Sequence, residues 1–300
     1  MRRSAVLSSV LLAIAGIASI AYGSVLAAES ESGPLATSFF RFSLAAPFCL
    51  AIGLLIDRGA AGALRLIGRW QIWLAGLAFA ATVSLWYEGQ RLSTVASAGA
   101  VHNLAPVVVI GIGWIVYRTL PRPSGVVGLI LVIFGGFLLV YEDFIEFGGS
   151  ALLGDELALA SAFTLAVYWL CIEELSEDAS AFTLIGLAAA IAAPCVLVPA
   201  LMSNEPLLPV NSSGWAILIG VAFFGQIGGH AALARAAVSI GAFGVTTVGL
   251  AEPALAAVLA LILLAQPVSL AEWTGIGVLA LGMALAQHGF RRFASGDRNS

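Results

Sequence analysis

Residues 241–267, GAFGVTTVGLAEPALAAVLALILLAQP, decide the fold because they place a carboxylate and a proline inside one long apolar run. The run is long enough to cross a bilayer as a helix, which takes about 20 residues. Glu252 lies near its centre, where an ionisable side chain costs at least about 2.5 kcal/mol. Pro253 leaves a backbone carbonyl that needs another partner. We therefore expect both residues to face a cavity or a packed helix, and not lipid.

The same arrangement occurs earlier in the chain, which indicates a duplication. Three pairs of identical residues share a separation of 147 residues and a similar place within a pair of apolar runs: Pro106 and Pro253, Gly128 and Gly275, Gly135 and Gly282. A period of about half the chain predicts two equivalent units.

The composition is that of a polytopic helical membrane protein. Of the 300 residues, 60% are hydrophobic and only 10% are charged, against about 25% charged in a soluble domain. The net charge is −4 and no basic block is present, so nucleic acid is not an expected partner. Cys49, Cys171 and Cys195 lie singly in apolar runs and have no metal or redox spacing. We expect no metal and no cofactor.

The apolar runs predict an all-α integral membrane protein with ten transmembrane helices. The expected spans are about 4–27, 34–56, 70–89, 93–117, 124–141, 153–173, 181–202, 213–234, 238–264 and 269–289. Residues 1–28 also resemble a signal peptide; we keep them as the first span because the repeat needs it. Residues 57–70 fit either a short interfacial helix or a basic loop.

The arginines predict the orientation in the membrane. With the N-terminus in the cytoplasm, eleven of the thirteen lie on the cytoplasmic side, Arg91 lies outside, and Arg41 lies within a span. This bias follows the positive-inside rule and puts both termini in the cytoplasm.

Ten spans divide into two five-helix units, 1–145 and 146–300. Five is an odd number, so the second unit enters the membrane from the opposite side and the two units form an inverted pair. Secondary transporters commonly use such pairs, with the substrate site near the midplane between the halves.

Five short motifs resemble those of the drug/metabolite transporter superfamily and of its ten-helix bacterial exporters. They are Tyr22-Gly23-Ser24, Arg41-Phe42, Leu104-Ala105-Pro106, Glu252-Pro253-Ala254, and Gly275 with Gly282. The resemblance covers nearly the whole chain and implies a duplicated five-helix fold. Within the superfamily the chain looks most like the amino-acid exporters, including the aromatic amino-acid exporters. It departs from them at Gln266-Pro267, where many members carry an acidic residue, and at Ala105, where the aromatic exporter has an aromatic residue.

These observations predict a secondary transporter that exports a small molecule by alternating access. The resemblance favours aromatic or other neutral amino acids, moved across the inner membrane of a bacterium. Other metabolites or drugs are the alternative. An embedded enzyme is disfavoured, because neither a Gly-x-Ser-x-Gly elbow nor a zinc-binding histidine spacing is present. The expected partners are the substrate and the lipid bilayer, and a monomer and a dimer are both compatible.

Polar residues at membrane depth are the first candidates for the substrate cavity. Glu252 fits a structural carboxylate that fixes the bend at Pro253; the alternative is a proton-titratable group or a contact for a substrate amine. His102 and Asn103, one turn before Pro106, fit either cavity groups or interhelical hydrogen bonds. Gln226 is the stronger cavity candidate on its helix face, whereas His230, one turn later, is expected to be structural.

Aromatic residues away from the membrane surfaces complete the candidate cavity: Tyr22, Trp86, Tyr87, Tyr168 and Trp169. Their rings could stack on an apolar or aromatic substrate. Pro106 and Pro253 are expected to act as gating kinks. Arg41 is expected to snorkel to the outer headgroups, with a substrate carboxylate as the alternative partner.

Overall fold

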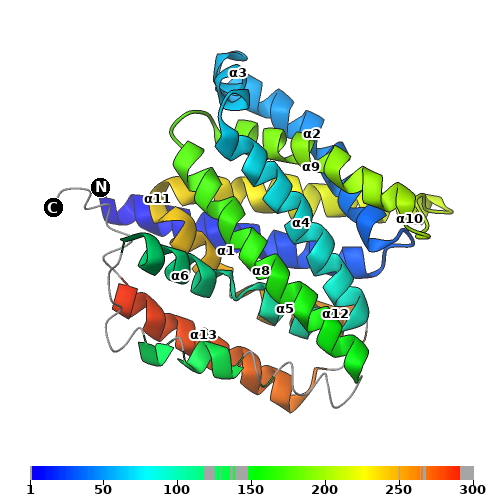
Figure 1. The fold of residues 1–300 in the computed structure, drawn as a ribbon, viewed down its shortest axis with the longest axis vertical. Helices are drawn as coiled ribbons and strands as arrows, with labels where there is room; N and C mark the ends of the chain where they lie inside the picture. The colour runs from blue at the N-terminus through cyan, green and yellow to red at the C-terminus, as the bar shows by residue number, and fades with distance from the viewer. Residues whose placement is uncertain are drawn as a thin grey trace.

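The computed structural model describes residues 2–117, 126–128, 130–135, 138, 148–249, 251–263, 265 and 268–290. Within these residues every regular element is a helix (Figure 1). The first half contains α1 (Arg2–Ala28), α2 (Pro34–Ile56), α3 (Ala61–Ile67), α4 (Trp70–Leu92), α5 (Val95–His102), α6 (Ala105–Tyr117) and the apolar helix Val126–Gly135. The all-helical prediction is confirmed for these residues.

The second half contains α8 (Gly149–Leu175), α9 (Ala181–Met202), α10 (Ser212–Gly220), α11 (Ala231–Val248), α12 (Ala251–Leu263) and α13 (Leu270–Phe290). A π-helix, η1 (Val221–His230), joins α10 to α11 without a break. Its wider turns follow an i→i+5 pattern, and π-helical turns often occur at functional sites.

Five helices of the described residues are long and apolar enough to cross a membrane: Leu7–Ala28, Pro34–Ile56, Gly149–Leu175, Ala181–Met202 and Ser212–Val248. A sixth span results if α3 and α4, which meet at 79°, are counted together. The full count of ten spans is therefore not confirmed. Of the two expectations for residues 57–70, a short helix and a basic loop, the structure shows the short helix, α3.

The expected spans 213–234 and 238–264 leave a connection at residues 235–237. This prediction is wrong, because α11 runs through these residues. The chain turns instead at Gly241, whose φ of 68° and ψ of 173° interrupt the helix. This backbone conformation is essentially restricted to glycine. No proline or polar cluster marks the turn in the sequence, which is why the apolar pattern placed it too early.

Both spans that carry the repeated prolines are discontinuous. The chain breaks at Asn103 and Leu104 between α5 and α6, and again at Gly249 before α12. In each case the proline lies in the first turn of the following helix, where the missing N–H is tolerated. The expected kinks at Pro106 and Pro253 are therefore complete breaks, at equivalent places in the two halves.

Helices of the first half pair antiparallel with helices of the second half. Helix α2 packs on α9, with the Leu35 N–H donating to Glu205 at one end and the Ser180 N–H donating to Asp57 at the other. Helix α4 packs on α8 along their length, and α1 packs on η1 and α11. These pairs put the core between the two halves.

The apolar helix Val126–Gly135 and α13 form a further antiparallel pair, and their contacts show the duplication directly. A Cβ on Gly135 would lie 2.9 Å from the carbonyl oxygen of Gly275, and a Cβ on Gly282 would lie 2.8 Å from that of Gly128. Gly282 is the repeat equivalent of Gly135, and Gly128 is the repeat equivalent of Gly275, so the two contacts join equivalent residues. Reciprocal contacts of this kind are what a two-fold relation between the halves produces.

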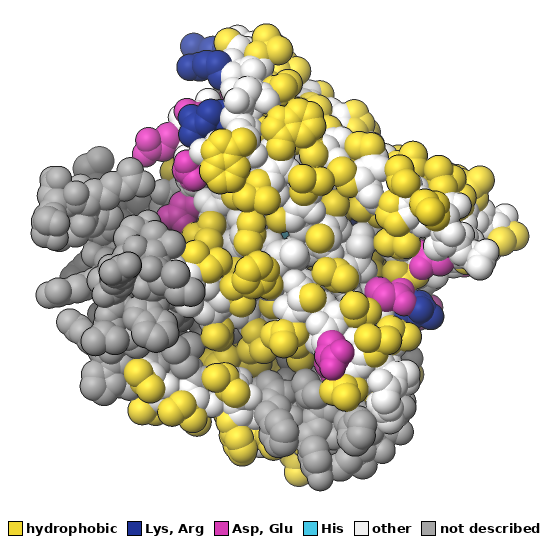
Figure 2. All heavy atoms as spheres, in the orientation of Figure 1, with side chains coloured by type: hydrophobic (Ala, Val, Ile, Leu, Met, Phe, Trp, Pro, Cys, Tyr) yellow, Lys and Arg dark blue, Asp and Glu magenta, His cyan; other side chains and the backbone are white. Residues whose placement is uncertain are grey.

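The outer surface suits a lipid environment. Figure 2 shows a face covered largely by hydrophobic side chains, with charged ones toward its margins. Exposed large apolar residues include Leu55, Met202 and Ile262, at 80%, 81% and 70% exposure. A surface of this kind on a soluble monomer would promote aggregation, so burial in a bilayer accounts for it.

Candidate functional site

A polar cavity lies between the two halves, at the level of the two helix breaks. Seventeen residues line it: Ile17, Ile20, Arg41, Phe79, Thr82, Val83, Trp86, His102, Asn103, Leu165, Trp169, His230, Leu233, Val245, Thr246, Gly249 and Glu252. Its volume is about 30 Å³, which holds about two water molecules. A ligand pocket usually measures about 300–1,000 Å³, so this cavity is contracted.

Arg41 is the cation of the cavity, and it comes from the first half of α2. Its side chain is 1% exposed. Nη1 donates to the Tyr87 hydroxyl at 2.8 Å, Nε donates to Gln226 Oε1 at 3.4 Å, and Nη2 donates to the Gly225 carbonyl at 3.4 Å. Among the described residues no carboxylate forms an ion pair with Arg41.

The π-helix provides the receptor for this guanidinium. Gly225, Gln226 and His230 all belong to η1, and His230 Nδ1 lies 3.1 Å from Arg41 Nη2 and 2.9 Å from the Gly225 oxygen. A Cβ on Gly225 would lie 3.0 Å from the Arg41 Cζ. The absence of a side chain at Gly225 therefore lets the guanidinium approach the backbone closely.

The expectation that Arg41 snorkels to the headgroups is wrong. Four polar atoms on α4 and η1 hold it inside the protein, two of them supplied by the expected cavity candidates Tyr87 and Gln226. Within the described residues this buried charge thus has hydrogen-bond partners but no counterion, an arrangement that is costly without a charged partner.

Glu252 is the anion of the cavity and lies in the first turn of α12. It is 4% exposed. Asn103, in the break before α6, donates from Nδ2 to Glu252 Oε2 at 3.3 Å and to the Gly99 carbonyl at 2.9 Å. Glu252 Oε1 has no hydrogen-bond partner among the described residues. One carboxylate oxygen is thus fixed and the other remains available as an acceptor.

Aromatic side chains form two walls of the cavity. On one wall Trp86 stacks on His102, with ring centroids 4.6 Å apart and an interplanar angle of 10°. His102 Nδ1 donates to Ser161 Oγ at 2.7 Å, because the Ser161 hydroxyl hydrogen is directed to the Ala158 carbonyl. On the other wall Trp169 stacks on His230, 5.7 Å apart and inclined by 4°.

The structure brings together five of the nine predicted cavity residues: Trp86, His102, Asn103, Trp169 and Glu252. Tyr87 and Gln226 lie behind the wall and hold Arg41. Tyr168 also lies behind it, stacked on Phe79 at 4.2 Å. Tyr22 does not reach the cavity, since it packs edge-on against Phe224 between α1 and η1. Pro106 is buried in the first turn of α6, and the side chain of Pro253 lies outside the described residues.

Sequence reasoning missed several cavity residues, above all His230, together with Phe79, Thr82 and Thr246. His230 follows Gln226 by four residues, a spacing that puts two side chains on one face of an α-helix. The spacing therefore indicated that the two residues act at one place, and in the structure both contact Arg41. Thr82 and Thr246 gave none, because hydroxyls that donate to their own helix are common in membrane spans.

The described residues contain no group of three or more His, Cys, Asp or Glu side chains that could hold a metal ion. The chemistry of the cavity is that of recognition: one cation, one anion, neutral hydrogen-bonding groups and aromatic faces. A small cavity with charged groups, placed between two halves of an apolar helical protein, is typical of one class, the multi-pass membrane transporters.

Comparison with known proteins identifies the family. A sequence model of the EamA-like transporter family matches residues 7–141 and again residues 152–286. The chain belongs to the EamA-like transporter family, a family of the drug/metabolite transporter superfamily with two repeats, and its members are transporters and not enzymes.

Other comparisons add the fold alone. A solved structure described as "Crystal structure of protein" is similar, with a TM-score of 0.67 and 20% sequence identity. The alignment covers 98% of this chain and 100% of that one. No protein of curated function matches the chain.

Proposed function

We propose that this transporter exports amino acids, or similar small zwitterions, across the inner membrane of a bacterium by alternating access. The observation that carries the proposal is the placement of Arg41 and Glu252 on one contracted cavity without an ion pair between them. Isolated charges at membrane depth are costly and mark functional sites.

An α-amino acid complements these two charges. Its carboxylate fits the guanidinium of Arg41. This group has five N–H donors, of which three donate to Gln226, Tyr87 and the Gly225 carbonyl. Its ammonium group fits Glu252, whose Oε1 has no partner among the described residues. Trp86 Nε1, also without a partner there, is a further donor for the carboxylate.

The walls of the cavity favour a neutral side chain on the substrate. The aromatic rings of Phe79, Trp86 and Trp169 line it together with aliphatic residues. Apolar contact and ring stacking with these walls favour aromatic and other apolar amino acids over charged ones.

Alternating access rests on two inverted five-helix repeats. The antiparallel packing of α2 on α9, which start at Pro34 and Ala181, 147 residues apart, supports the inverted relation. The proposed boundary between residues 145 and 146 falls in the ten residues between the two matched segments. The arginine distribution supports ten spans with both termini in the cytoplasm.

Transport by purified protein in liposomes tests this proposal. The panel consists of radiolabelled neutral L-amino acids, the amine that lacks the carboxylate and the acid that lacks the amine, each with and without a pH gradient. We expect saturable movement of an apolar or aromatic amino acid and at least about tenfold weaker transport of both truncated analogues, since each loses a charge-assisted hydrogen bond. Equal transport of the amino acid and its truncated analogues would rule out recognition of a zwitterion and point to other metabolites or drugs.

A further inference from the structure

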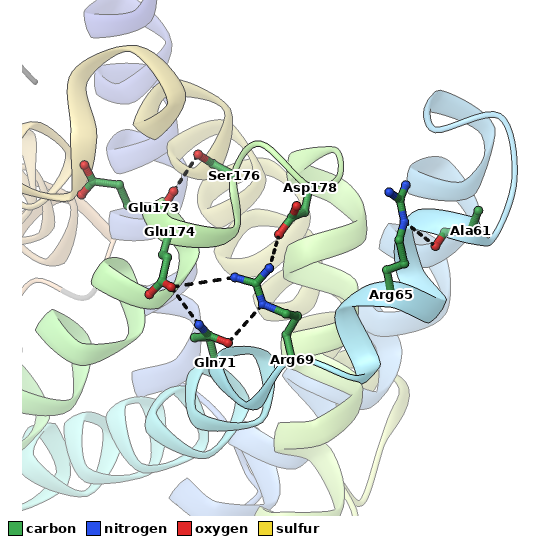
Figure 3. A network of polar contacts seen from close by, with 8 residues as sticks. All are labelled: Ala61, Arg65, Arg69, Gln71, Glu173, Glu174, Ser176 and Asp178. Atoms are coloured by element: carbon green, nitrogen blue, oxygen red, sulfur yellow. Dashed lines mark hydrogen bonds and ion pairs between the residues drawn. The ribbon is translucent and has the colours of Figure 1, made fainter. Parts of the chain in front are cut away.

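The last turn of α8 carries two adjacent carboxylates that hold two different helices. Figure 3 shows them diverging, with Glu173 directed toward α11 and Glu174 toward Gln71 and Arg69 at the start of α4. Both residues are exposed on the surface of the described structure. They lie at one end of the bundle, which we call the Arg69 end.

Glu173 caps the helical segment that follows the turn at Gly241. Its Oε2 accepts the N–H of Ala242 at 2.7 Å, and a Cβ on Gly241 would lie 3.1 Å from its Oε1. The first N–H groups of a helix lack partners within the helix, so a carboxylate at this place stabilises the helix start. Glu173 thus fixes the direction that the chain takes after Gly241.

Glu174 belongs to a network with the start of α4. Its Oε1 accepts from Gln71 Nε2 at 2.8 Å and lies 3.8 Å from Arg69 Nη2. Arg69 Nη1 also donates to Asp178, at 3.3 Å. The side chains of Arg69 and Glu174 are 44% and 55% exposed, and ion pairs this exposed are individually weak. The network can therefore open and close without a large barrier.

The two held elements carry different parts of the cavity wall. The segment after Gly241 supplies Val245, Thr246 and Gly249, and leads directly to Glu252. Helix α4 supplies Phe79, Thr82, Val83 and Trp86. The end of α8 therefore ties together, at the Arg69 end, the walls that must separate for a substrate to pass.

The opposite end of the bundle has an equivalent contact between the halves. Glu31 follows α1 as Asp178 follows α8, 147 residues later, and accepts from Asn211 Nδ2 at 2.7 Å and from the Val210 N–H at 3.0 Å. Asn211 precedes α10 as Arg69 precedes α4. We call this the Glu31 end.

Helices α4 and α8 are held differently at the Glu31 end, where the Ser93 hydroxyl at the end of α4 donates to the buried carboxylate of Asp155 on α8 at 3.0 Å. There Gly89 and Gly154 bring the two backbones together, and a Cβ on either residue would lie 2.8 Å from the carbonyl oxygen of the other. A tight glycine contact at one end and exposed polar bonds at the other make the Arg69 end the one that separates more easily.

We propose that Glu173 and Glu174 form the gate of the cavity at the Arg69 end, and that Gly241 is the hinge of this gate. Release of Ala242 by Glu173 frees the segment that bears the Thr246 wall to swing about Gly241, while release of Gln71 by Glu174 frees α4. The proposal rests on alternating access, but it concerns the opening of the cavity and not the identity of the substrate. The two carboxylates act as positioning residues.

Side-specific labelling of a cavity residue tests the gate. Thr246 is replaced by Cys in a protein whose three native cysteines are changed to Ala, and a membrane-impermeant thiol reagent is added from either face of oriented vesicles. We expect the E173A/E174A double variant to raise the rate of labelling from the Arg69 end by about tenfold or more and to leave labelling from the Glu31 end unchanged.

Three further variants control this experiment. Glu177→Gln removes a charge from the same turn without touching either network and should behave like the parent. Glu173→Gln keeps an oxygen that can accept from Ala242 and should restore most of the closed state that Glu173→Ala loses. Glu31→Gln weakens the equivalent contact and should raise labelling from the opposite face only.

Two results would overturn the gate. One is labelling of the double variant at the parental rate from both faces. The other is an equal increase from both faces, which would show general loosening and would be accompanied by a lower Tm. Because the assay contains no substrate, a failure to transport amino acids leaves these outcomes interpretable, and a failed gate leaves the transport assay untouched.

Discussion

Asn103 and Glu252 join the two helix breaks to each other across the centre of the protein. The Nδ2 group of Asn103, in the break before α6, donates to Oε2 of Glu252, in the first turn of α12. The Asn103 Oδ1 atom lies against Gly249, where a Cβ would be 2.9 Å away. The discontinuous span of one half thus holds the carboxylate of the other in place.

Loss of this bond should impair both transport and stability. In Asn103→Ala the Glu252 carboxylate loses its one hydrogen bond in the described structure, so we expect the free energy of unfolding to fall by about 1–3 kcal/mol. Transport should fall by at least tenfold because Glu252 is no longer oriented. Gln90→Ala, which removes a 2.7 Å bond to Ser24 outside the cavity, should lower Tm with little effect on transport. Equal transport defects in the two variants would contradict a specific role for Asn103.

Arg41→Lys should raise KM for the zwitterion more than it lowers the turnover rate. Lysine keeps the charge but cannot reach Tyr87, Gln226 and the Gly225 carbonyl in one planar fork. A lost charge-assisted hydrogen bond of about 1.5–3 kcal/mol corresponds to roughly a 10–100-fold weaker interaction. The amine analogue that lacks the carboxylate should be insensitive to this change. A parallel loss for both compounds would mean that Arg41 supports the fold and not the substrate.

Tyr87→Phe tests how Arg41 is positioned. The variant removes only the hydroxyl that accepts from Arg41 Nη1 at 2.8 Å, so we expect the same direction of change as in Arg41→Lys with a smaller size, about 3–10-fold in KM. Trp73→Phe is a suitable control, since its indole donates to the Ile67 carbonyl at the surface. We expect KM to rise in Tyr87→Phe and to stay at the parental value in Trp73→Phe. An unchanged KM in Tyr87→Phe would contradict a role for its hydroxyl in positioning Arg41.

Gly135→Ala and Gly282→Ala should destabilise the protein to a similar extent. Each added methyl would lie under 3.0 Å from backbone atoms of the partner helix, and overpacking of this kind costs about 1–3 kcal/mol. Gly277→Ala on α13 meets nothing within 4 Å and should be neutral or slightly stabilising. Thermal unfolding in detergent gives all three values. Strongly unequal effects of the first two changes would contradict the two-fold relation of these helices.

Gly241→Ala should slow transport even where substrate binding persists. Its backbone conformation costs any other residue about 1–3 kcal/mol, so the turn before Ala242 should shift. We expect a lower turnover rate with a smaller change in KM. Gly99→Ala, at a helical glycine with open space around it, serves as the control. An unchanged turnover rate in Gly241→Ala would argue against a hinge at this residue.

The repeat was the most informative part of the sequence. Pro106 and Pro253 have the same physical effect wherever they occur, so their spacing located two helix breaks and the centre of the molecule between them. Gly135 then proved to contact Gly275, and Gly282 to contact Gly128, because small residues at equivalent positions allow equivalent helices to approach.

Arg41 shows what sequence could not supply. Its distance from the end of α2 gives its depth in the membrane but not the helix it faces. That helix is η1, nearly 200 residues further along the chain, and its π-helical turn has no composition that sets it apart from an α-helix. The burial of Arg41 and the position of His230 follow from this one tertiary contact, which hydropathy does not encode.

The contracted cavity has a consequence for the energy supply of the cell. Room for about two water molecules cannot support a hydrogen-bonded water chain across a hydrocarbon layer about 30 Å thick. Within the part of the chain that the structure describes, this cavity therefore gives protons no continuous water path from one face to the other. In this state the cavity itself therefore offers no water-filled leak for the proton-motive force.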